Sequence, residues 1–316
     1  MRVCDLLKKM EEGRILKASQ GLLLLDLHEK RIVPVHQELR VLLYAGLLLI
    51  IAGAGWTVKT HFASLGDLAV ISALSLCAAA AFLYVVRKGP GFDRGRVASP
   101  SMAFDYILFF GCAFFAMDIA YLETRFGMLG SGWMHYLLLS TLLFGALAFR
   151  YDNRLVLSMA LSSLAAWFGF TLSDVSVFRF DAYWRFYAIA YAMVVFTAGL
   201  LSHRLGVKKH FFDIWLNFAI HFLCLALLAG VFEYKILSLY FPLLAAACVL
   251  TAMYALRSRR FFYMLFAMGY GYIGASFVIV DWMEREVVLI FTYFVLSSLA
   301  VVWSVFKLSR RFKEMP

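Results

Sequence analysis

Residues 134–173 read MHYLLLSTLLFGALAFRYDNRLVLSMALSSLAAWFGFTLS, a pattern that points to one class of fold. Two apolar runs, 134–149 and 154–173, flank the short polar segment RYDN. A membrane-spanning helix needs about 20 mainly apolar residues, because it has to cross a hydrocarbon core of roughly 30 Å. The stretch is therefore predicted to be a hairpin of two membrane-spanning helices joined by a short basic turn.

Apolar runs of this kind recur along the whole chain. Of the 316 residues, 63% are hydrophobic and 16% are charged, whereas a soluble domain is about half apolar and about a quarter charged. We expect ten spans, at residues 39–57, 67–86, 103–121, 134–149, 154–173, 183–202, 211–231, 236–256, 261–280 and 287–306. The predicted fold is all-α, a polytopic integral membrane bundle of about ten helices. Residues 1–37 would form a cytoplasmic amphipathic segment, 38–308 the bundle and 309–316 a tail.

The basic residues are distributed unequally between the two sides of this predicted topology. Six of the 30 lie in or beside the odd-numbered loops, namely Lys59, Arg125, Arg179, Arg185, Lys235 and Arg285. The other 24 lie in the N-terminal segment, the even-numbered loops and the tail. Because cytoplasmic loops are enriched in Lys and Arg, we expect a bacterial inner-membrane protein with both termini in the cytoplasm. The net charge of +10 then reflects topology and contact with the lipid bilayer, so nucleic-acid binding is not needed to explain it.

The motifs of several enzyme classes are missing from the sequence. It contains no HExxH, GxSxG or GxxxxGK[ST] pattern, which weighs against a zinc protease, a serine hydrolase and a P-loop enzyme. A haem held by two histidines needs both of them deep in facing helices, and only His221 is placed deep in a predicted span. Its five cysteines form no CxxC pair: Cys4, Cys77, Cys112, Cys224 and Cys248. We therefore expect no catalytic residue, no metal site and no cofactor.

A weak internal period runs through the middle of the chain. Four arginines, Arg96, Arg150, Arg204 and Arg257, are 54, 54 and 53 residues apart. A small residue precedes the last three by five positions (Gly145, Gly199 and Ala252), and small residues let helices approach closely in lipid. The spans on either side of these three arginines are predicted to form related hairpins. The alternative is coincidence, because any two spans with their loops measure about 50 residues.

One predicted span carries a line of polar side chains. In the stretch HFFDIWLNFAIH, the residues His210, Asp213, Asn217 and His221 are spaced 3, 4 and 4 apart, which places them on one face of a helix. Ionisable groups inside a membrane face the bundle interior or a water-filled cavity. Two interpretations stay open: interhelical hydrogen bonds that hold helices together, or a path for protons or cations that uses the histidine.

Two further spans contain residues of interest. The stretch FAMGYGYIGASF includes Gly269, Gly271 and Gly274, which favour either close helix packing or a local helix break. On another span, Arg185 is expected to extend its side chain to the outer surface. Asp118 lies near the same face of the membrane and is a candidate partner for Arg185.

The N-terminal part of the chain resembles a known family. The residues that carry the resemblance are EEGRILKASQGLLLL and LRVLLYAGLLLIIAGAGWTVKTHFASLGD. They are similar to the glycine-then-helix start and the glycine-rich first span of a family of bacterial predicted membrane proteins, domain of unknown function 2157. The resemblance covers mainly the first 90 or so residues. It implies many membrane spans and a bacterial cell membrane, and it brings no established activity.

These observations leave two functions open. The first is a transporter-like protein that moves a small solute or ion along a polar path formed by His210, Asp213, Asn217 and His221. The second is a membrane scaffold or sensory subunit without catalytic activity, whose N-terminal segment binds a cytoplasmic protein partner.

Overall fold

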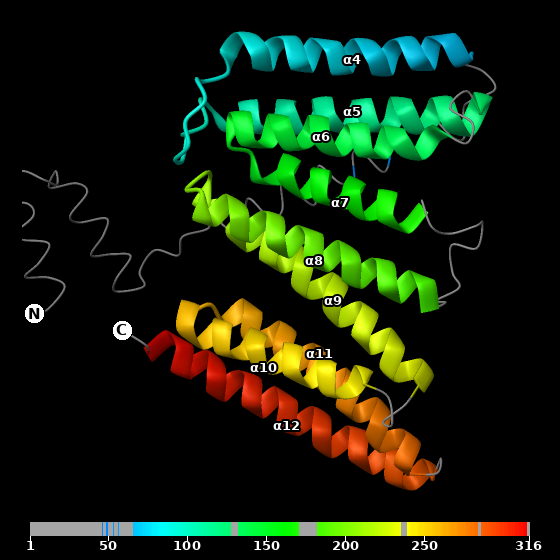
Figure 1. Cartoon of the computed structure of the whole chain (residues 1–316), viewed down its shortest axis with the longest axis vertical. Helices are drawn as coiled ribbons and strands as arrows, with labels where there is room; N and C mark the ends of the chain where they lie inside the picture. The colour runs from blue at the N-terminus through cyan, green and yellow to red at the C-terminus, as the bar shows by residue number, and fades with distance from the viewer. Residues whose placement is uncertain are drawn as a thin grey trace, which may run out of the picture. The chain divides into compact units, whose positions relative to one another are not determined.

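The computed structural model describes residues 66–127, 132–170, 182–234, 239–283 and 286–314, together with four positions between residues 46 and 56. Across these residues the chain forms nine α-helices and a short 3-10 helix, and no strand (Figure 1). In chain order they are α4 (Asp67–Lys88), α5 (Met102–Phe126), α6 (Trp133–Tyr151), α7 (Arg154–Phe170), α8 (Ala182–Arg204), η2 (Lys209–Phe211), α9 (Phe212–Tyr234), α10 (Tyr240–Ser258), α11 (Phe261–Trp282) and α12 (Val287–Glu314). The all-α prediction is confirmed for this part of the chain.

Seven of these helices are long and apolar enough to cross a membrane, which indicates a membrane protein. They are α4, α5, α8, α9, α10, α11 and α12. The nine helices coincide with nine of the ten predicted spans, but the apolar part of α7 is shorter, Arg154–Gly169. The remaining predicted span, 39–57, and the N-terminal segment 1–37 lie outside the described residues apart from the four positions. The count of ten spans therefore stays a prediction.

The chain divides into two compact units, Met1–Val70 and Ile71–Pro316. Within the second unit, the most extensive contacts between helices are those of α6 with α7, α8 with α9, and α10 with α11. These are the three hairpins predicted from the period of arginines. The structure thus pairs the helices as the sequence predicts, while a common origin of the three hairpins is a separate question.

Two of the hairpins turn in the same way. The residue after α6, Asp152, has φ 58° and ψ 37°, and the residue after α10, Arg259, has φ 54° and ψ 34°. In each turn the backbone N–H groups of this left-handed residue and of the next one bond to a single carbonyl, that of Ala148 or Ala255. The left-handed conformation closes the helix by satisfying a free carbonyl. The sequences AFRYDNR and ALRSRRF therefore code for one turn geometry.

The α8–α9 hairpin has a longer turn with a different course. Gly206 adopts φ +74° after the end of α8, and the N–H of Val207 bonds to the carbonyl of Ser202 at 3.1 Å. Lys208 follows with φ 48°, and the chain then enters η2 and α9. The extra residues bring Lys208 and His210 toward the α6–α7 turn, where both contact Asp152.

The small residues of the period differ in what surrounds them. A Cβ atom added at Gly199 would lie 2.5 Å from the Cβ of Trp215, so α8 and α9 approach closely there. No described atom lies within 4 Å of such a Cβ at Gly145, the corresponding position in α6. Close approach, the predicted reason for a small residue, holds for one of these two positions.

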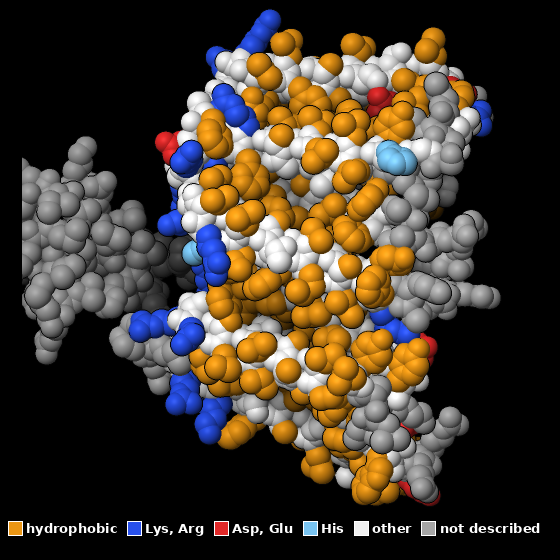
Figure 2. All heavy atoms as spheres, in the orientation of Figure 1, with side chains coloured by type: hydrophobic (Ala, Val, Ile, Leu, Met, Phe, Trp, Pro, Cys, Tyr) orange, Lys and Arg blue, Asp and Glu red, His pale blue; other side chains and the backbone are white. Residues whose placement is uncertain are grey.

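Charged and apolar side chains occupy different parts of the surface. Figure 2 shows most Lys and Arg side chains gathered along one edge of the second unit, at the ends of the helices that are joined by the basic turns. Apolar side chains cover the middle of the view. This distribution suits helices whose middle sections contact lipid tails and whose ends meet water.

Candidate functional site

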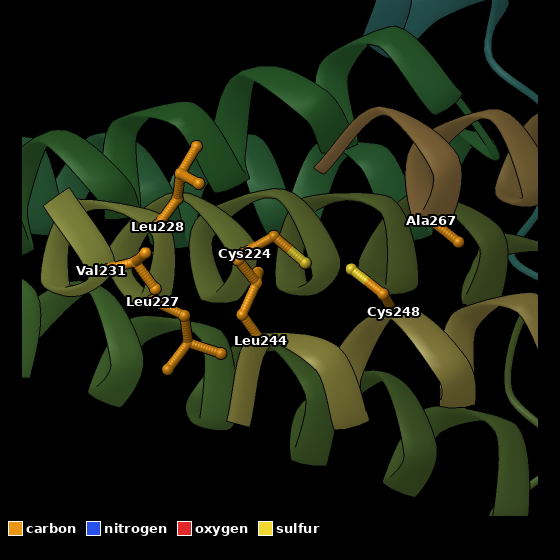
Figure 3. Close-up of a cluster of buried hydrophobic side chains, with 7 residues drawn as sticks. All are labelled: Cys224, Leu227, Leu228, Val231, Leu244, Cys248 and Ala267. Atoms are coloured by element: carbon orange, nitrogen blue, oxygen red, sulfur yellow. The ribbon is translucent and has the colours of Figure 1, made fainter. Parts of the chain in front are cut away.

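Helix α9, which carries the predicted polar line, packs against several other helices. It contacts α8, α10, α11 and α7. Its apolar residues Cys224, Leu227, Leu228 and Val231 form a buried cluster with Leu244, Cys248 and Ala267 of α10 and α11 (Figure 3). The residues of α9 therefore lie at the centre of the α8–α11 helices. The polar side chains of the predicted line have two sets of partners, one in the α6–α7 turn and one in and beside α11.

The first member of the line, His210, lies in η2 rather than in α9. Its Nε2 is hydrogen-bonded to the carboxylate of Asp152 in the α6–α7 turn. The Lys208 Nζ lies 3.2 Å from the other carboxylate oxygen of Asp152. The side chain of Asp152 is 3% exposed and that of Lys208 is fully buried. Sequence reasoning placed Lys208 among the basic loop residues and missed its role as the buried partner of an acid.

Asp152 also bonds to the connection between α4 and α5. The backbone N–H of Val97 donates to Asp152 Oδ2 at 2.6 Å, and the N–H of Lys208 donates to the carbonyl of Arg94 at 2.8 Å. Burial tends to raise the pKa of Asp152, but the hydrogen bonds from Val97, His210 and Lys208 outweigh it and lower that pKa. Asp152 is therefore a fixed negative charge that joins three separate connections of the chain.

Asp213, the second member, is directed at the α10–α11 turn. Its carboxylate forms an ion pair with Arg260, and its backbone carbonyl accepts a hydrogen bond from the Tyr263 hydroxyl at 3.3 Å. Both contacts lie at the beginning of α9 and α11. They join the first turns of α9 and α11 at the end of the interface where the basic residues lie.

The last two members, Asn217 and His221, lie further along α9. The Nδ1 of His221 is 2.7 Å from the Tyr270 hydroxyl of α11, and its ring packs edge-on against Phe266 with centroids 4.2 Å apart. Asn217 lies between Asp213 and His221 on α9. Its Oδ1 is buried and has no hydrogen-bond partner among the described residues. We call Asp213, Asn217, His221, Arg260 and Tyr270 the α9–α11 seam.

The structure thus brings together three of the four predicted residues and separates the fourth. Asp213, Asn217 and His221 belong to the α9–α11 seam, whereas His210 turns toward the α6–α7 turn because the 3-10 geometry of η2 changes its direction. Tyr270 lies in the stretch FAMGYGYIGASF, and the sequence alone does not identify it as the partner of His221. Tyr270 lies seven residues after Tyr263 on α11, so both tyrosines are on one face of that helix. Their spacing is one residue shorter than that of Asp213 and His221 on α9, and comparing polar spacings between the two spans would have pointed to this pairing.

Helix α11 is continuous through Gly269, Gly271 and Gly274, which leaves close packing rather than a helix break. A Cβ atom at Gly274 would lie 2.6 Å from Leu244 Cδ2 of α10 and 3.6 Å from Leu228 of α9. At Gly271 the nearest atom is Cys248 Sγ at 3.8 Å, and at Gly269 the described residues leave open space. Gly274 is the glycine that the packing requires.

The expected position and partner of Arg185 are wrong. Its side chain is 1% exposed and does not extend to the surface, because it pairs with Glu233 of α9. Its guanidinium also lies 5.0 Å from the centre of the Tyr234 ring and 5.7 Å from that of Tyr240. Asp118 instead lies against Ser75, with 2.5 Å between Oδ2 and the serine hydroxyl. Aromatic stacking thus stabilises the arginine inside the helix packing.

Comparison of the chain with protein-family models, with curated proteins and with solved structures finds no match. The resemblance of the N-terminal residues to domain of unknown function 2157 stays a prediction.

Proposed function

We propose that the protein is transporter-like and moves a small solute or ion, most simply a proton, along the α9–α11 seam. The observation that carries the proposal is that the buried Asn217 Oδ1 has no hydrogen-bond partner within the part of the chain that the structure describes. Buried polar atoms almost always have a hydrogen-bond partner, and exceptions are explained by an unseen water, an ion or a functional role. An amide oxygen between an ion pair and a histidine is suited to hold a water molecule in a proton path.

The spacing along α9 supports this path. At 1.5 Å per residue, Asn217 lies about 6 Å from Asp213 along the helix and His221 about 12 Å from it. One or two water molecules bridge gaps of this size, and a histidine can change its protonation near neutral pH. The Tyr270 hydroxyl, 2.7 Å from His221, would continue the chain of proton-carrying groups.

The proposal places the seam in a bundle of ten helices. Both termini would be in the cytoplasm of a bacterium, as the excess of basic residues at one edge suggests (Figure 2). The α9–α11 seam would then open on the cytoplasmic side at Asp213 and Arg260 and reach toward the middle of the membrane at His221. Membership of the family domain of unknown function 2157 is compatible with this placement.

The experiment is proton flux in liposomes that contain the purified protein and a pH-sensitive dye. Flux should be lost in His221→Phe and in Asn217→Leu. The matched control is His203→Phe, because His203 of α8 also packs against a phenylalanine ring, Phe212, at 5.2 Å between centroids, and lies outside the seam. Folded wild-type protein that moves no protons, or seam variants that keep the wild-type flux, would show that the seam is only interhelical packing.

The alternative function is a scaffold or sensory subunit that binds a cytoplasmic protein through residues 1–35. This segment lies outside the described residues, so the alternative has no structural observation in its favour. Deletion of residues 1–35 tests it directly, because a scaffold would lose its co-purifying partner while the remaining helices stay folded.

A further inference from the structure

Helix α12 ends in a segment that carries exposed basic side chains. Residues 287–306 contain no charged side chain, and at 1.5 Å per residue they span about 30 Å, which is the thickness of a hydrocarbon core. The helix continues past them to Glu314. Lys307 therefore lies where α12 leaves the apolar part of a membrane, and Arg310 and Arg311 lie about 5 Å further along the helix axis.

The two faces of α12 have different surroundings. On the inner face, Leu308 and Phe312 pack against a buried cluster of side chains from α9, α10 and α11. On the outer face, Leu299, Trp303 and Phe306 are 64%, 62% and 65% exposed. No described residue in the most apolar section of α12 is buried. The outer face is therefore a surface that lipid can reach.

The outer face changes from apolar to basic toward the end of the helix. Leu299, Trp303, Phe306 and Arg310 follow one another at intervals of 4, 3 and 4 residues, so they share one face of α12. Lys307 lies beside them, with its Nζ 4.7 Å from the centre of the Trp303 ring. This cation–π contact holds the Lys307 side chain at the boundary. We call these five residues the α12 stripe.

The cations of this segment are not neutralised by acids of the described part of α12. Residues 287–312 contain no Asp or Glu, and no ion pair within the described residues involves Lys307, Arg310 or Arg311. By contrast, Arg260 in the α10–α11 turn pairs with an acid of α9. The positive charge at the end of α12 is therefore available to an anionic ligand.

An anionic phospholipid matches the order of side chains along the α12 stripe. Its acyl chains would contact Leu299 and Phe306, and its phosphate would lie beside Lys307 and Arg310. Tryptophan is enriched at the level of the headgroups, and basic clusters directly after a spanning helix attract anionic headgroups. Arginine also suits the geometry of phosphate oxygens. A soluble anion would use the cations but not the apolar half of the stripe.

We propose that the α12 stripe is a binding site for an anionic phospholipid, which it prefers to a zwitterionic one. Arg311 adds a further cation at the side of the stripe. The site is separate from the α9–α11 seam and does not depend on the proposed transport along it.

Native mass spectrometry of the full-length protein in detergent, titrated with phosphatidylglycerol or phosphatidylcholine, tests the proposal. The wild type should bind its first phosphatidylglycerol more tightly than its first phosphatidylcholine. A cation at a membrane surface strengthens binding about fivefold, so the double variant Lys307→Gln/Arg310→Gln should bind phosphatidylglycerol about 25-fold more weakly. The matched control, Arg87→Gln/Lys88→Gln, removes the same two charges from exposed residues at the end of α4 and should keep the wild-type affinity.

A further variant distinguishes a positioned site from general attraction by charge. Trp303→Leu keeps the net charge and an apolar side chain but removes the ring beneath Lys307, so phosphatidylglycerol should bind about two- to fivefold more weakly. The proposal is overturned if the wild type binds both lipids equally or if either α12 variant keeps the wild-type affinity. An equal loss in the α4 control would likewise overturn it. Competition by soluble glycerol phosphate at the lipid's concentration would identify a site for a free phosphate ester instead.

Discussion

Two glycines at corresponding positions of the internal period should respond in opposite ways to alanine. A Cβ atom at Gly199 would meet the Trp215 Cβ at 2.5 Å, while at Gly145 the described residues leave open space. Carbon atoms pack at about 3.5–4.0 Å, so α8 and α9 would have to separate by about 1 Å. No rotamer change avoids this contact, because the Trp215 Cβ is fixed to its backbone.

The difference between the two variants isolates the cost of this contact. Both gain about 1 kcal/mol from the higher helix propensity of alanine, and this gain cancels in the comparison. Overpacking of a tight contact costs about 1–3 kcal/mol. We expect Gly199→Ala to have a free energy of unfolding about 1–3 kcal/mol below that of Gly145→Ala, measured by denaturant unfolding in detergent with circular dichroism. Equal stabilities would refute the close approach of α8 and α9.

Three other predictions concern the connections and the buried arginine. Because the pKa of Asp152 is lowered in the folded protein, its stabilising effect is complete above the unfolded pKa of about 3.9 and is lost as pH falls through the folded pKa. Unfolding measured from pH 7 to 3 should show this acid-dependent loss in wild type, and it should be absent from the less stable Asp152→Asn. Asn153→Ala removes the side-chain oxygen that accepts from the N–H groups of Leu155 and Val156, so unfolding experiments should show a loss of about 0.5–2 kcal/mol. Arg185→Gln should lower the thermal unfolding temperature, and an unchanged midpoint would show that the buried guanidinium contributes nothing.

The positions of the described helices along the chain could be predicted from the sequence, because each helix coincides with a long apolar run. The predicted span 261–280 corresponds to α11, Phe261–Trp282. The span 287–306 covers only part of α12, which continues to Glu314. Hydropathy marks where a chain is apolar, whereas helical hydrogen bonding continues through the basic residues that follow. The predicted end of the span marks the end of the apolar run and not the end of helix α12.

The contacts of the polar line depended on information that one sequence does not contain. Helical spacing correctly placed Asp213, Asn217 and His221 on one face of α9, because that relation is local. The partners of Asp213 and His221 lie about 50 residues away, and the partner of His210 is 58 residues away at Asp152. Which helix faces which is decided by the packing of apolar side chains, and a polar pattern within one span does not reveal it.

The charged groups of the described helices differ according to their depth. Three acids at helix ends, Asp152, Asp213 and Glu233, are each paired with a basic side chain. Such pairs hold connections and helix ends together, and they explain their own presence without a ligand. Asp118 and Asn217 lie inside helices, and each has a buried oxygen without a hydrogen-bond partner among the described residues. Since an unpartnered polar atom costs most away from water, these two positions are where a bound water molecule has the largest effect on stability.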